Sequence, residues 1–193
     1  MSEWLHGSWA QRVTLLCWAV FFLYWAIAAF GTKRVVERSG GWWQRVLVLA
    51  VVVFVVSRSR LGGGVLNTRV WLPSTLTGVI GVLLLVGGLA LALRARAVLG
   101  GNWSGTVTIK AEHELIQRGP YHYVRHPIYS AILLMMLGTA VVDGRALWFV
   151  GAALCLAGFT VKARSEEQLL TKHFPDAYPE YRRRVKAIIP FVL

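Results

Sequence analysis

Two polar stretches of an otherwise apolar chain carry the residue types that could do chemistry. Residues 99–130 contain tyrosines, histidines and arginines, and residues 162–190 contain paired glutamates and a run of arginines. The faces of tyrosine rings attract cations, and carboxylates hold ammonium groups through charge-assisted hydrogen bonds. A ligand that carries both positive and negative charge would therefore find partners in these two stretches.

In the first stretch, a helix is expected to begin directly after a cluster of rings and cations. Gly119-Pro120 is a turn signal, and His126 precedes Pro127, which favours an extended residue followed by a helix start. The N-terminus of a helix favours an anionic group. These residues indicate a ligand site. The alternative, which composition alone favours, is an interfacial belt of tyrosines with snorkelling Arg and His side chains.

The second stretch continues the last apolar run out of the membrane as a polar helix. Lys162 and Glu166 are four residues apart, so they lie on one face of that helix. They form either an exposed ion pair or a carboxylate placed to bind a ligand amine. Arg182-Arg183-Arg184 is expected to contact anionic lipid headgroups.

The composition is that of a membrane protein. The chain has 193 residues, of which 56% are hydrophobic and 16% are charged, and its formal net charge is +12. An ordinary soluble domain has about 25% charged residues, so these values exclude a disordered chain, a coiled coil and a disulfide scaffold, and they argue against a soluble enzyme. The positive charge fits an anionic membrane surface, and nucleic acid is not expected as a partner. No Cys/His pair has zinc spacing, so no metal is expected.

Apolar runs predict an all-α, multi-pass bundle of about five transmembrane helices. The runs are residues 13–30, 42–56, 70–93, 128–142 and 146–161. The second run is short and spans only with tilt or local thinning of the bilayer. The three residues between the last two runs predict an antiparallel helical hairpin. Residues 1–98 would form the first three helices, and residues 99–193 a core with the hairpin of residues 128–161 and C-terminal helices.

Most Lys and Arg residues fall on one side of the membrane if the chain crosses five times. The loops of residues 31–45 and 94–127 then share a side with the C-terminal tail. The positive-inside rule assigns this side to the cytoplasm and the N-terminus to the outside. Both polar stretches would meet at the cytoplasmic face and form a pocket there.

Three separated sequence blocks resemble the isoprenylcysteine carboxyl methyltransferase family. They are LGGNWS at residues 99–104, GPYHYVRHPIY at residues 119–129, and a tail with Glu166-Glu167, HFPDAYPEYRRRV at residues 173–185 and a terminal IIP. The resemblance covers about half of the chain and is more specific for the superfamily than for the substrate. Phospholipid N-methyltransferases and the C-terminal halves of sterol reductases resemble the same pattern.

The resemblance implies an integral membrane enzyme that binds S-adenosylmethionine between the loop of residues 99–130 and the C-terminal helices. The cofactor-binding residues that it implies, with Glu167 added as a second partner for the cofactor ammonium, are Glu114, Tyr121, His122, Tyr123, Val124, His126, Tyr129, Leu134, Leu137, Glu166 and Glu167. Lys162, Glu166 and His126 are the expected catalytic residues. Lys162 stands where the family carries a substrate-facing arginine.

The expected reaction is methyl transfer to a lipophilic acceptor that enters from the bilayer, foremost the carboxylate of an isoprenylcysteine-like, prenylated substrate. A carboxylate is ionised at neutral pH and needs no general base. An amine acceptor, as in a phospholipid N-methyltransferase, would need one, with His126 or Glu167 as the candidate. An NADPH-dependent sterol-type reductase and a non-catalytic membrane subunit are the remaining alternatives.

Overall fold

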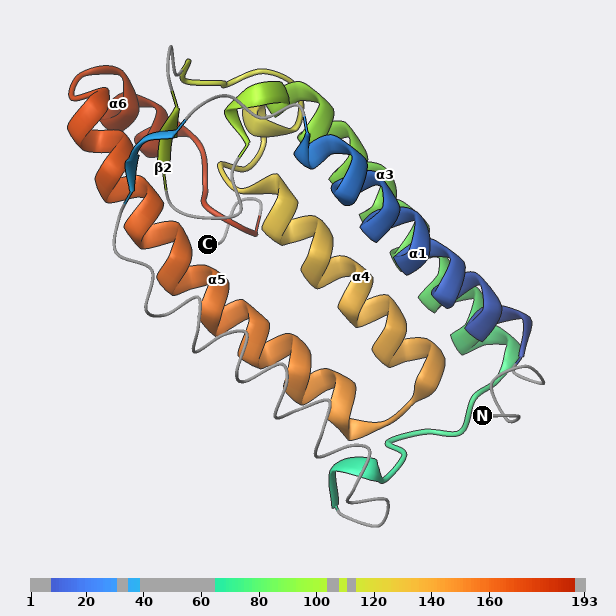
Figure 1. Cartoon of the computed structure of the whole chain (residues 1–193). Helices are drawn as coiled ribbons and strands as arrows, with labels where there is room; N and C mark the ends of the chain where they lie inside the picture. Colours follow the sequence, from blue (N-terminus) through green and yellow to red (C-terminus); the bar gives the residue numbers. More distant parts are fainter. Residues whose placement is uncertain (1–7, 31–34, 39–64, 104–107, 111–113, 190–193) are drawn as a thin grey trace.

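The computed structural model describes residues 8–30, 35–38, 65–103, 108–110 and 114–189. Long helices that run alongside one another make up most of this part of the chain (Figure 1). The helices are α1 (Trp9–Ala29), α3 (Thr75–Leu99), α4 (Pro127–Asp143), α5 (Ala146–His173) and the short α6 (Ala177–Arg184). This arrangement confirms the predicted fold class, a helical bundle of a membrane protein.

Three of the described helices are long and apolar enough to cross a membrane. They are α1, α3 with the turn that follows it, and α5. Helix α4 is apolar but has 17 residues, and it lies between α3 and α5 (Figure 1). The predicted second span, residues 42–56, lies outside the described residues, so the count of five spans stays a prediction.

Two short strands depart from the all-helical prediction. β1 (Val35–Arg38) pairs antiparallel with β2 (Thr108–Lys110). Strand β1 follows α1 and β2 follows α3, so the pairing joins two connecting segments at the same end of the bundle (Figure 1). These are the first and third loops that the sequence assigned to one side of the membrane. The remaining short elements that the structure describes are the 3₁₀ turns η1 (Val65–Asn67), η2 (Gly100–Asn102) and η3 (Gly119–His122).

Glycines bring α3 and α4 into close contact. A Cβ atom on Gly81 would lie 2.8 Å from the carbonyl oxygen of Gly138, and one on Gly138 would lie 2.7 Å from that of Gly81. A Cβ on Gly88 would lie 2.9 Å from the carbonyl oxygen of Ala131. Backbones at this separation exclude larger side chains, as in other close helix pairs of membrane proteins. The contact fixes the position of α4, and therefore of its N-terminus, against α3.

The predicted hairpin between α4 and α5 is present. Gly144 ends α4 with a φ of +74°, and a Cβ there would lie 2.5 Å from the carbonyl oxygen of Trp71. The indole N–H of Trp148 donates to Asp143 at 2.8 Å, and that of Trp71 donates to the carbonyl of Val141 at 3.1 Å. These contacts fix the end of the bundle opposite α6 (Figure 1).

Polar contacts as well as apolar packing attach helix α1 to the bundle. The indole N–H of Trp18 donates to the hydroxyl of Thr139 at 3.0 Å. Arg96, which the sequence placed in the loop after the third span, is 4% exposed and donates to the carbonyls of Ala28 and Gly100, each at 2.6 Å. The guanidinium therefore satisfies carbonyls at the C-terminal ends of both α1 and α3.

We expect Gly81→Ala to destabilise the protein, because the added methyl group would meet the backbone of α4. Gly87→Ala on the same helix is the matched control, since nothing lies within 4 Å of a Cβ built there. Overpacking costs about 1–3 kcal/mol, whereas alanine at an open helical position is favoured by up to about 1 kcal/mol. Thermal unfolding in detergent, followed by circular dichroism, should show a lower Tm for G81A alone. An unchanged Tm for G81A would contradict the close packing of α3 on α4.

Candidate functional site

The two polar stretches lie side by side at one end of the bundle. The chain that follows α6 runs parallel to the segment that precedes α4, and Val124 bridges to Lys186. The backbone N–H of Arg125 donates to the carbonyl of Lys186, and that of His126 donates to the carbonyl of Ala187, each at 2.8 Å. The tail therefore holds the loop in place just before α4 begins.

A cluster of charged side chains fills the junction of this loop with α5 and α6. The ionic cluster consists of Arg125, His126, Lys162, Glu166, Glu167 and Arg182. Glu167 is its buried centre. Arg125 donates to one carboxylate oxygen of Glu167 from Nε at 2.9 Å and from Nη2 at 2.6 Å. Arg182 Nε lies 3.5 Å from the other oxygen of Glu167.

Glu166 is the more open of the two carboxylates, with 21% of its side chain exposed against 8% for Glu167. The hydroxyl of Tyr129 donates to Glu166 Oε1 at 2.6 Å, and Lys162 Nζ lies 3.9 Å from the same oxygen. The other oxygen, Oε2, faces Nδ1 of His126 at 3.3 Å. A cationic ligand that enters the cluster from solvent therefore reaches Glu166 more easily than Glu167.

His126 is buried between the two carboxylates. Its Nδ1 lies 3.3 Å from Glu166 and its Nε2 lies 3.3 Å from Glu167. Burial alone would lower the pKa of His126, but the hydrogen bonds to Glu166 and Glu167 and their negative charges raise it above its usual value. A carboxylate at each ring nitrogen favours the imidazolium form, in which both nitrogens donate.

Aromatic rings form a stack beside the ionic cluster. The ring of Tyr129 is nearly parallel to that of His126, with centroids 5.2 Å apart, and to that of Phe159, with centroids 4.6 Å apart. Lys162 Nζ lies 5.2 Å from the centroid of the Tyr129 ring. Carboxylate oxygen, aromatic face and ammonium group thus lie within one small region, which suits a ligand of mixed charge.

Tyr121 lies on the α3 side of the loop. Its hydroxyl donates to the carbonyl of Ala95 at 3.4 Å, and its own carbonyl accepts a hydrogen bond from the hydroxyl of Tyr181. Burial raises the pKa of Tyr121, and the nearby charge of Glu166 and the ring of Tyr181 raise it further. Tyr121 therefore lies within electrostatic range of Glu166, although its hydroxyl is bonded to α3.

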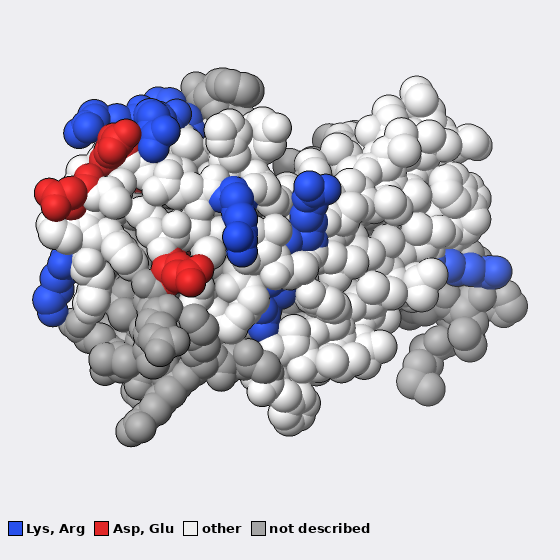
Figure 2. Space-filling model, turned by 90° about the horizontal axis from the view of Figure 1, so that it is seen from above, with Lys and Arg blue, Asp and Glu red and all other residues white. Residues whose placement is uncertain are grey.

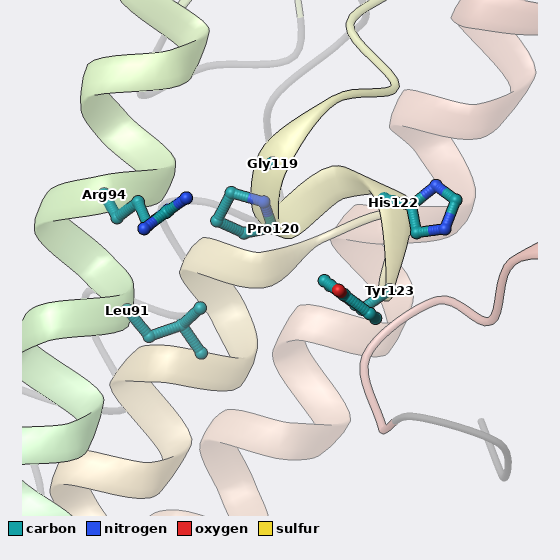
Figure 3. A pocket seen from close by; sticks show the side chains of 6 residues that line it. All are labelled: Leu91, Arg94, Gly119, Pro120, His122 and Tyr123. Atoms are coloured by element: carbon teal, nitrogen blue, oxygen red, sulfur yellow. The ribbon is translucent and has the colours of Figure 1, made fainter.

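A groove of about 540 Å³ lies between α3 and η3 (Figure 3). Its lining residues are Leu91, Arg94, Gly119, Pro120, His122 and Tyr123. The lining is mostly apolar, and Figure 3 shows Arg94 pointing from α3 toward the ring of Pro120. The side chain of Tyr123 is 69% exposed. The groove thus offers a mostly apolar surface with the guanidinium of Arg94 among its lining groups.

The structure brings together only part of the residues that the sequence singled out. His126, Tyr129, Lys162, Glu166 and Glu167 lie in or against the ionic cluster, and His122 and Tyr123 line the groove. The other predicted residues are distributed as follows: Val124 is buried beside the tail, Leu134 and Leu137 lie on α4 with Leu137 40% exposed, and Glu114 is exposed before η3. Their roles in cofactor binding stay predictions.

The sequence did not assign a role in the cluster to three residues of α6, namely Arg182, Tyr178 and Tyr181. Arg182 was expected to contact lipid headgroups, yet it also pairs with Glu167. Tyr178 and Tyr181 are 1% and 3% exposed and attach α6 beneath the loop. Two tyrosines three residues apart in a polar helix were the available signal of a buried face.

The fold and the site define an integral membrane helical protein with a charged, partly buried cluster at one end of the bundle. The chain belongs to the phospholipid methyltransferase family, whose model matches residues 76–177. The match begins within α3 and so crosses the domain boundary that the sequence placed at residue 98.

Curated relatives are similar to this chain over part of its length. The chain is 33% identical over 105 residues to a protein-S-isoprenylcysteine O-methyltransferase of Schizosaccharomyces pombe, covering 52% of this chain and 44% of that one. It is 28% identical over 152 residues to the cobalt-zinc-cadmium resistance protein CzcN of Cupriavidus metallidurans, covering 78% of this chain and 62% of that one. The chain therefore spans about half the length of the curated relatives that it matches.

A solved structure shares the fold. The eukaryotic intramembrane Ras methyltransferase ICMT, an isoprenylcysteine carboxyl methyltransferase, superposes with a TM-score of 0.52 at 21% identity, covering 77% of this chain and 52% of that one. At this identity the likeness concerns the fold alone, and it supports the helical membrane architecture.

We expect Glu167→Gln to destabilise the protein strongly, because it would leave the buried guanidinium of Arg125 without its counter-charge. Breaking one partner of a buried pair typically costs about 3–5 kcal/mol. Glu180→Gln is the matched control, since the Glu180 side chain is 60% exposed and pairs with Arg184 at 3.6 Å, a surface pair of at most about 1 kcal/mol. Chemical denaturation in detergent should separate the two variants, and equal stabilities would contradict a structural role for Glu167.

Proposed function

We propose that this protein transfers a methyl group from S-adenosylmethionine to a lipophilic acceptor, foremost the carboxylate of an isoprenylcysteine-like substrate. The observation that carries the proposal is the position of Glu166. This carboxylate is partly open, accepts a hydrogen bond from the Tyr129 hydroxyl, and is held where the two polar stretches meet. Membership of the phospholipid methyltransferase family supports the reaction class.

The charges of the methyl donor match the groups at this junction. S-adenosylmethionine carries an ammonium, a carboxylate and a sulfonium. In the proposed complex the ammonium binds Glu166, and tyrosine faces stabilise the sulfonium through cation–π attraction. The groove beside His122 and Tyr123 offers an apolar surface of a size suited to the adenosine half (Figure 3).

The charge of the cluster favours a carboxylate acceptor over an amine, because its cationic side chains outnumber its two carboxylates. An amine acceptor needs a general base to take its proton, whereas a carboxylate attacks the sulfonium methyl group directly. Catalysis then rests on alignment and desolvation, and alignment alone can supply about 7–11 kcal/mol in favourable systems.

Lys162 is the proposed partner of the acceptor carboxylate. Its ammonium group lies 3.9 Å from Glu166 and over the ring of Tyr129. An anion bound to Lys162 would therefore lie close to a donor bound to Glu166. We assign Lys162 this orienting role, with His126 and Glu166 completing the proposed site.

We further propose that this end of the bundle faces the cytoplasm and that the N-terminus lies outside. Figure 2 looks onto the end and shows Lys and Arg side chains around it. Arg182, Arg183 and Arg184 are all exposed there. Cationic residues at one end of a bundle are retained on the cytoplasmic side. An acceptor with a prenyl chain would then arrive from the bilayer and the methyl donor from the cytoplasm.

A phospholipid amine N-methyltransferase is the second candidate, and the description of the matching family favours it. Methyl transfer in detergent from S-adenosylmethionine with a labelled methyl group separates the two acceptors. We expect label on a farnesylcysteine analogue with a free carboxylate and none on phosphatidylethanolamine. The opposite labelling would establish the amine reaction, and stabilisation by NADPH with no binding of S-adenosylmethionine would overturn both in favour of a reductase.

Glu166→Gln should weaken binding of S-adenosylmethionine about 10- to 150-fold, because a hydrogen bond to a charged group contributes about 1.5–3 kcal/mol. Glu180→Gln, at an exposed position of α6, should leave the dissociation constant unchanged. Equilibrium dialysis with labelled cofactor measures both variants. Unaltered binding by E166Q would show that Glu166 does not hold the ammonium.

A further inference from the structure

The ionic cluster carries more positive than negative charge. Four cationic side chains, those of Arg125, His126, Lys162 and Arg182, surround the carboxylates of Glu166 and Glu167. Among these cations, histidine has the ordinary pKa nearest to neutrality. His126 is therefore the cation of the cluster that can most readily lose its charge.

Ionisable groups from four segments interact with His126 directly or through Glu166 and Glu167. Helix α5 contributes Lys162, Glu166 and Glu167, α4 contributes Tyr129, the loop contributes Tyr121 and Arg125, and α6 contributes Tyr178, Tyr181 and Arg182. Only the two glutamates lie within hydrogen-bonding reach of its ring nitrogens among these described groups. The charge on His126 therefore depends on whether another cation neutralises these two carboxylates.

We propose that His126 is the internal counter-cation of the empty site and that the ammonium group of S-adenosylmethionine replaces it at Glu166. His126 gives its proton to solvent as the ammonium binds. This inference rests on the proposed function and adds a proton to its binding step. Glu166 keeps its hydrogen bond from Tyr129 throughout.

The exchange follows from the charge balance. An ammonium group that binds Glu166 beside a protonated His126 would place two like charges within a few ångströms, which disfavours both. Loss of one proton from His126 removes this repulsion and leaves the cation count of the cluster unchanged. Neutral His126 can still donate from Nε2 to Glu167, so its ring keeps its position.

The sign of the pH dependence is fixed by this competition. Because the cofactor ammonium competes with a proton, affinity for S-adenosylmethionine rises with pH, by up to about tenfold per pH unit. The rise ends once the pH exceeds either the pKa of His126 in the empty site, which lies above its usual value, or the pKa of the cofactor's own α-amino group, about 7.7–8.0. Methyl transfer to a carboxylate neither consumes nor releases a proton, so the proton is released only when the cofactor binds.

Isothermal titration calorimetry in buffers of different ionisation enthalpy measures the protons released on binding. With the full-length protein in detergent at about pH 7, we expect release of a large fraction of one proton per S-adenosylmethionine bound. Titration with 5′-methylthioadenosine, which lacks the ammonium, should release none. His126→Gln should abolish the release, whereas His173→Gln should preserve it, because His173 lies at the end of α5 with its Nδ1 near the carbonyl of Leu169.

Each failure of this experiment has one meaning. Binding of S-adenosylmethionine without proton release between about pH 6 and pH 9 overturns the inference and leaves the proposed function intact. Equal release with 5′-methylthioadenosine, or undiminished release in H126Q, also overturns it. If H126Q does not fold, the comparison of the two ligands on the unaltered protein still decides. No binding of S-adenosylmethionine at all overturns the proposed function itself.

Discussion

The guanidinium of Arg125 is the contact on which the whole polar end depends. It donates to Glu167 of α5, to the carbonyl of Arg182 at 3.2 Å and to the carbonyl of Val185 just after α6. One side chain of the loop thus contacts α5, α6 and the segment after α6, through residues that lie 42, 57 and 60 positions further along the chain. Its desolvation is costly, and the cost is offset only while all these acceptors are in place. The geometry of His126 and Glu166, the neighbours of this pair in sequence, follows from it.

The membrane helices supply the rigidity that this contact needs. Arg125 and His126 precede α4 directly, so any displacement of α4 would move both. The close approach of Gly81 to Gly138 fixes α4 against α3. Arg96 adds a second constraint, because it holds the C-terminal ends of α1 and α3 together under the loop. The apolar bundle therefore defines where the charged residues stand.

The sequence was a good guide wherever one local property decided the structure. Hydropathy predicted the helical membrane fold, the short polar turn predicted the α4–α5 hairpin, and the i, i+4 spacing predicted the pairing of Lys162 with Glu166. The sequence did not predict contacts between residues that are far apart along the chain. No local pattern reveals that β1 pairs with β2, or that Arg182, whose side chain is largely exposed, pairs with Glu167. The burial of Arg96 depends likewise on the carbonyl of Ala28, 68 residues away.

The charge of the cluster also bears on the acceptor of the proposed methyl transfer. Cations outnumber the two carboxylates, so the cluster attracts an anionic acceptor beside a donor whose ammonium is bound at Glu166. When a carboxylate attacks a sulfonium, the opposite charges neutralise each other in the transition state. Such a reaction gains from a site with little water, because less charge remains to be solvated at the transition state than in the separated reactants. With an amine acceptor the positive charge only moves from sulfur to nitrogen, and this gain is absent. Burial of Tyr129 and His126 at the junction of helices and membrane therefore favours transfer to a carboxylate.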